Sequence, residues 1–88
     1  MAAATRFDDN TTLRDIEKYR EKEGDLIIQI RKHRGCPTWS VHFFQPSPLG
    51  SPAPHRHVAA GSSKRSIGIA LANAADDYER FKMGLHNG

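Results

Sequence analysis

The clearest feature of the sequence is a long amphipathic stripe near its C-terminal end. Apolar side chains recur there at the 3.6-residue spacing of one helical face: Ile67, Ala70, Leu71, Ala74, Tyr78, Phe81 and Leu85. The spacing predicts a helix from Ser63 to about Met83. Small residues beside the stripe, Gly68, Ala72 and Ala75, indicate that this helix lies close to a sheet.

A shorter helix is predicted near the start of the chain. Thr12 and Asp15 resemble a capping box, in which each side chain bonds the other residue's backbone N–H. Gly24 suits the position just after a helix, where the backbone often turns left-handed. These signals predict a first helix from Thr12 to Glu23.

The segments 26–33 and 38–45 alternate apolar and polar residues, which is typical of strands with one buried face. In the second segment, Trp39, Val41 and Phe43 should face one way, and Ser40, His42 and Phe44 the other. Arg34 to Pro37 form a turn between them. We therefore expect an antiparallel hairpin whose apolar rows meet on one face.

The segment 46–54 contains four prolines, which exclude helix and ladder pairing and predict an exposed loop. A short third strand is expected at 55–60, broken by Gly61 and Ser62. The predicted fold class is α+β, a single domain of order α-β-β-(β)-α with helices on one face of an antiparallel sheet. It should span residues 11–88, preceded by a flexible tail at 1–10.

The charges are unevenly distributed. Residues 26–75 contain six basic residues and no aspartate or glutamate, whereas the flanking segments carry net charges of −2 and −1. This segment favours a negatively charged partner, either a nucleic acid or an acidic protein surface. Cys36 is the only cysteine, so no disulfide can form within the chain, and we expect a reducing, cytoplasmic setting. No apolar run approaches the roughly 20 residues of a membrane helix, and no membrane partner is predicted.

Two basic clusters are candidate binding sites, one at the end of the first strand and in the hairpin turn, the other at the start of the last helix. Exposed N–H groups at a helix start bind anions, although cations there oppose the helix dipole. Both clusters also fit a plainer interpretation, because charged strand ends prevent aggregation and solvated cations cost little. The candidate phosphate- or partner-binding residues are Arg31, Lys32, Arg34, Arg56, Ser63, Lys64 and Arg65.

The chain resembles the double-stranded-RNA-binding domain family in element order over Thr11 to Met83. The run Gly61-Ser62-Ser63-Lys64-Arg65, followed by an alanine-rich helix, is similar to that family's glycine-serine-lysine-lysine sequence before its last helix. The family contacts RNA through the loop between its first two strands and through the start of its last helix. The resemblance therefore implies RNA contacts at 34–37 and 63–65. The family's histidine-bearing hairpin loop is not reproduced, and the 46–54 segment is foreign to it.

Catalytic and metal-binding patterns are weak. His55 and His57 alternate as two ligands on a strand would, with His33, His42 or Cys36 as third ligands, but no cysteine pair or neighbouring carboxylate accompanies them. Cys36 lies in a turn without a carboxylate to orient a histidine partner. Solvated histidines and a non-catalytic protein are the expectation, with no metal and no cofactor.

Two functions are consistent with these features. The favoured one is a stoichiometric inhibitor or adaptor that binds an acidic protein surface or a nucleic-acid-binding protein complex, with Phe44 or Ile69 as apolar anchors. In its organisation the chain looks like small phage proteins that disarm bacterial defence, such as anti-CRISPR proteins. The alternative is a nucleic-acid-binding module that contacts phosphates directly. A homodimer is compatible with both, if the outward apolar residues cluster.

Overall fold

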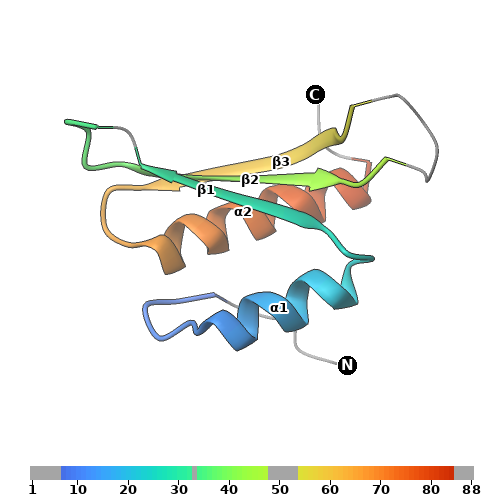
Figure 1. Cartoon of the computed structure of the whole chain (residues 1–88), viewed down its shortest axis with the longest axis horizontal. Coiled ribbons are helices and arrows are strands. Elements are labelled where there is room, and N and C mark those ends of the chain that lie inside the picture. The colour runs from blue at the N-terminus through green and yellow to red at the C-terminus, as the bar shows by residue number, and fades with distance from the viewer. Residues whose placement is uncertain (1–6, 33, 48–53, 85–88) are drawn as a thin grey trace.

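The computed structural model describes residues 7–32, 34–47 and 54–84. The element order is α1 (Leu13–Lys22), β1 (Ile27–Lys32), β2 (Trp39–Gln45), β3 (Arg56–Ser63) and α2 (Ile67–Lys82). The strands form one antiparallel sheet in the order β1-β2-β3, and both helices lie on the same side of it (Figure 1). The expected α+β class is confirmed. Neither helix in the described ranges is long and apolar enough to cross a membrane, and most of the predicted 46–54 loop lies outside those ranges.

α1 begins and ends as predicted. The backbone N–H of Asp15 donates to Thr12 Oγ1 at 3.2 Å, and the Thr12 N–H donates to the Asp15 carboxylate at 3.0 Å. Hydrogen bonds from the Thr12 backbone N–H and, second, from the Thr12 side chain to the Asp15 carboxylate lower the pKa of Asp15 below its ordinary value. Beyond the C-cap residue Glu23, Gly24 has a φ of +81°, a conformation that glycine adopts without steric cost. The capping residues in the sequence therefore predicted both ends of this helix correctly.

The hairpin buries the apolar row that the alternation predicted. Ile28 pairs with Phe43, and Ile30 pairs with Val41, so these side chains share the face covered by the helices. Val41 and Phe43 are fully buried. The opposite face of the sheet, which we call the outer face, is turned away from both helices.

β3 is longer than predicted, because Gly61 and Ser62 continue the strand instead of breaking it. A Cβ on Gly61 would lie 2.6 Å from the carbonyl oxygen of Ala70 and closer still to the backbone nitrogen of Ala74. Glycine in a strand often marks such a close approach of another backbone. The missing side chain lets α2 lie directly against β3.

Phe7, which lies inside the expected flexible tail at 1–10, is packed against the fold, while residues 1–6 of that tail lie outside the described residues. Phe7 is 4% exposed, and its ring meets that of Tyr19 at a centroid distance of 5.0 Å. Tyr19 in turn contacts Phe43 at 5.8 Å, and Phe43 contacts Tyr78 at 6.0 Å. This series of rings joins the N-terminal segment and α1 to the sheet and α2.

α2 begins later than predicted. Its N-cap is Ser66, whose Oγ accepts a hydrogen bond from the N–H of Ile69 at 3.2 Å. Lys64 and Arg65 therefore precede the helix and do not lie in its first turn. Gly68 also has a different role from the one expected, because a Cβ there would collide with the backbone of Asp8 and not with the sheet.

We expect Gly61→Ala to lower the free energy of unfolding by about 3 kcal/mol or more, since the added methyl group meets backbone atoms of α2 that cannot rotate away. Urea denaturation followed by circular dichroism measures the effect. Ser62→Ala on the same strand is the control and should change stability by less than about 0.5 kcal/mol. Equal stability of the two variants would contradict the close packing of β3 on α2.

A second prediction concerns Tyr19, whose buried hydroxyl has no hydrogen-bond partner among the described residues. Tyr19→Phe should leave stability unchanged or raise it by up to about 2 kcal/mol, because an unsatisfied buried hydroxyl is itself costly. Burial, reinforced by Glu23 and Glu79, raises the pKa of Tyr19 above its ordinary 10.0.

The folded state therefore favours the protonated phenol, so the stability that this group contributes is present below pH 10 and is lost as the pH rises above it. Tyr19→Phe should show a smaller loss of stability between about pH 9 and 11 than the wild type. A destabilised variant with an unchanged alkaline profile would contradict this account.

Candidate functional site

The two predicted basic clusters meet at one end of the sheet. Lys32, at the end of β1, pairs with Trp39 at the start of β2, and Trp39 pairs with Ser63 at the end of β3. At a strand spacing of about 4.8 Å, the backbones of Lys32 and Ser63 are roughly 10 Å apart. Figure 1 shows the β1–β2 turn and the β3–α2 link at this same end of the sheet. We call the cations gathered here the basic end: Arg31, Lys32, Arg34, Lys64 and Arg65.

Contacts within the basic end support this placement. Lys32 Nζ lies 4.8 Å from the centroid of the Trp39 ring, in a cation–π contact. The pKa of the exposed Cys36 thiol is lowered, first by hydrogen bonds with Thr38 and further by the charge of Lys64. The contribution of Lys64, on the β3–α2 link, is consistent with its place beside the β1–β2 turn. Lys32, Arg34, Cys36 and Pro37 line a shallow depression there.

The basic end is not neutralised by ion pairs. Over residues 7–32, 34–47 and 54–84, the salt bridges join Arg20 to Glu17 and Lys82 to Glu23 and Glu79, all outside the basic end. Strands β1, β2 and β3 contain no carboxylate at all. The positive charges of the two loops therefore remain available to an external anion.

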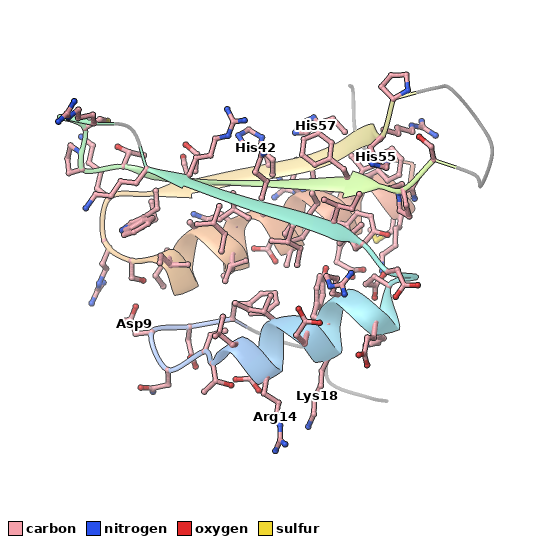
Figure 2. The ribbon with its side chains drawn as sticks, in the orientation of Figure 1. Asp9, Arg14, Lys18, His42, His55 and His57 are labelled. Atoms are coloured by element: carbon pink, nitrogen blue, oxygen red, sulfur yellow. The ribbon has the colours of Figure 1, made fainter. Side chains whose placement is uncertain are left out.

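The predicted anion site at the start of α2 is filled by the protein itself. The Ser66 hydroxyl donates to Asp9 Oδ1 at 2.6 Å, so a carboxylate of the N-terminal segment lies at this helix end. Figure 2 shows Asp9 below the β3–α2 link. A negative charge is favoured there by the helix dipole. An external anion would have to bind the loop cations beside this position rather than the helix terminus.

Ser63 has a structural role in the link before α2. Its Oγ accepts hydrogen bonds from the backbone N–H groups of Arg65, at 2.9 Å, and Ser66, at 3.5 Å. The side chain thereby shapes the turn that carries Lys64 and Arg65. Lys64 and Arg65 lie on a loop before the helix, so their charges do not oppose the helix dipole in the way the sequence suggested.

Arg56 does not belong to the basic end, contrary to the prediction. It pairs with Gln45 at the opposite end of the sheet, and its guanidinium lies 5.1 Å from the centroid of the Phe81 ring. The predicted apolar anchors are also separated. Phe44 is on the outer face, whereas Ile69 is half-buried on α2, the helix that covers the other face. They cannot form one patch.

Sequence reasoning missed a group of rings on the outer face. His42 Nδ1 and His57 Nε2 are 3.1 Å apart, and the Phe44 ring lies 5.1 Å from that of His57 (Figure 2 labels the two histidines). The pattern paired His57 with His55, but His55 instead accepts a hydrogen bond from the Ser47 N–H. The described residues include no group of three or more histidine, cysteine or acidic side chains that could hold a metal ion.

Comparisons of the chain with protein-family models, with curated proteins and with solved structures found no match. The function is therefore argued from the geometry of the basic end and of the outer face.

The outer face yields a titration prediction. We expect the pKa of His42 to lie below its ordinary 6.5, because burial disfavours the charged ring and the charges of His57 and Arg31 oppose its protonation. The folded state then binds this proton less readily than the unfolded chain, so folding stability should fall as the pH drops below about 6.5. NMR titration of the histidine ring protons measures the pKa.

His57→Gln removes one opposing charge and keeps a polar neighbour, so it should raise the pKa of His42 toward 6.5. His55→Gln is the matched control and should leave that pKa unchanged. A wild-type value at or above 6.5, or equal shifts in the two variants, would contradict the arrangement of the rings.

Proposed function

We propose that the protein is a non-catalytic nucleic-acid-binding module that contacts phosphates through the basic end. The observation that carries this proposal is that the end of β1, the β1–β2 turn and the β3–α2 link together place five cations at one end of the sheet, with no ion-pair partner among the described residues. Phosphate contacts of this kind release counterions, which supplies sequence-independent affinity. A cytoplasmic location is part of the proposal and is supported by the single cysteine, Cys36.

The resemblance to double-stranded-RNA-binding domains supports the same surface. That family contacts RNA through the turn between its first two strands and through the segment that opens its last helix. In this chain the corresponding residues are 34–37 and 63–65, which lie at the same end of the sheet. The element order α-β-β-β-α agrees with the order on which the resemblance was based.

The inhibitor or adaptor function is a second proposal. The observation that favours it is a cleft between α1 and the sheet, lined in part by Leu13, Ile16, Ile30 and Trp39. Leu13 is 81% exposed and Ile30 is 38% exposed, so apolar surface is open to a protein partner here. This cleft would replace the anchors Phe44 and Ile69, which lie on different sides of the molecule.

Fluorescence anisotropy with labelled RNA and DNA tests the first proposal. If all five cations contact phosphates, the wild-type affinity should fall about 10²- to 10³-fold between about 50 and 200 mM salt, since each contact adds about 0.9 to the log–log slope. The double variant Arg34→Ala, Lys64→Ala should reduce that slope by about two and weaken binding at least about tenfold.

Lys22→Ala is the matched control, because Lys22 is an exposed cation at the C-terminal end of α1, away from the basic end. It should leave both affinity and slope nearly unchanged. Absence of binding to every duplex and single strand at about 50 mM salt would remove the nucleic-acid proposal. Stoichiometric retention of a protein from nuclease-treated lysate, abolished by Ile30→Glu, would then favour the inhibitor or adaptor function.

A further inference from the structure

The outer face of the sheet carries a continuous group of aromatic rings. Strand alternation points His42 and Phe44 of β2 to this face, and a bulge at Phe43/Phe44 brings His57 of β3 opposite Phe44. The ring centroids are 5.2 Å apart for His42 and His57, 5.1 Å for Phe44 and His57, and 6.5 Å for His42 and Phe44. No helix covers these rings, because α1 and α2 both lie on the opposite face (Figure 1).

The outer face combines a cation with aromatic rings. Such a surface suits a ligand that carries both negative charges and flat, apolar groups. Arg31 lies on this face, paired with Ser40, while Gln29 pairs with His42 beside it. The charge of Arg31 is near enough to contribute to the lowered pKa of His42, after burial and the charge of His57. The three strands contain no carboxylate, so none of their own side chains repels phosphate; the Asp77 carboxylate of α2 approaches this sheet through a hydrogen bond from the Ala60 N–H of β3.

Arg31 also connects the rings to the basic end. It precedes Lys32, which stands at the last position of β1 beside the hairpin turn. A strand whose phosphates contact the basic end could therefore continue along β1 and β2 and place its bases over the rings. Bases within a duplex are stacked on one another, so only unpaired bases can meet a protein ring in this way.

We infer that the outer face is a stacking platform for the unpaired bases of single-stranded nucleic acid, formed by Phe44, His42 and His57 with Arg31 on the neighbouring phosphate. The inference rests on the proposed function and adds the ligand class. It departs from the double-stranded-RNA-binding resemblance, because the basic end alone does not distinguish single strands from duplexes whereas the rings suit unpaired bases. Stacking on aromatic side chains tolerates any base sequence, because every base has a π face. The platform thus binds single strands without sequence readout.

The test compares an oligothymidylate of about twelve nucleotides with an abasic oligomer of the same length, which keeps the phosphates and lacks the bases. The wild type should bind the oligothymidylate at least about tenfold more tightly at the same salt concentration. Phe44→Leu keeps an apolar side chain and removes the ring, so it should weaken oligothymidylate binding about tenfold and leave abasic binding unchanged. Arg34→Ala should weaken both.

His57→Gln provides a second variant on the exposed edge strand if Phe44→Leu lowers the melting temperature, and it should show the same selective loss. Ser40→Ala, on the same face without a ring, is the control and should bind like the wild type. Equal wild-type affinity for the two oligomers, with both still salt-dependent, would overturn the platform and leave the proposed function standing. Failure to bind either oligomer or any duplex would overturn both.

Sedimentation of the same variants tests whether a second copy of the chain, rather than a nucleic acid, covers this face. If Phe44→Leu leaves oligothymidylate affinity unchanged and converts a dimer to a monomer, the rings form a contact between two copies of the chain, and the stacking platform is wrong. A wild type and a variant of the same mass, with the affinity loss above, support the platform.

Discussion

The close approach of β3 and α2 at Gly61 determines the rest of the structure. The backbone of the strand lies against Ala70 and Ala74 because no Cβ separates them. Two further contacts keep the helix parallel to this edge: Asn73 donates to the Ser62 carbonyl at 2.8 Å, and the Ala60 N–H donates to Asp77 at 3.0 Å. Once α2 is fixed along β3, its first residues must lie beside the end of β3. That position sets the β3–α2 link next to the β1–β2 turn and so forms the basic end.

The sequence predicted the features that depend on local chemistry. The capping box of α1 and the left-handed Gly24 are decided within a few residues, and the alternation of β2 follows from burial of one face. Gly61 was misread as a strand end because its role lies in contact with a distant helix, and intrinsic propensity carries no information about that contact. The start of α2 was placed too early because Ser63 and Ser66 are equally good capping residues by type.

The parts of the candidate site that could not be predicted are those formed by distant residues. Asp9 and Ser66 are 57 positions apart, and no local pattern links them. The pairing of His42 with His57 depends on the strand register and on the bulge at Phe43/Phe44, which alternation alone does not reveal. Arg56 was grouped with the other cations by composition, although the antiparallel register puts it at the opposite end of the sheet. Charge along the sequence therefore predicted that cations cluster, but not which of them belong to the cluster.

Asp9 limits how the basic end can act. Its carboxylate accepts a hydrogen bond from the Ser66 hydroxyl at the start of α2, where the helix dipole favours a negative charge, so a phosphate at this position would meet a like charge. Under the proposed function, affinity would come from side chains at the end of β1 and on the two connecting segments, which are longer and more adaptable than a helix terminus. Such contacts position a backbone without reading bases. Selectivity for one form of nucleic acid would have to arise elsewhere, and the uncovered face of the sheet, with rings and no carboxylate, is the surface of the described structure that has the chemistry to supply it.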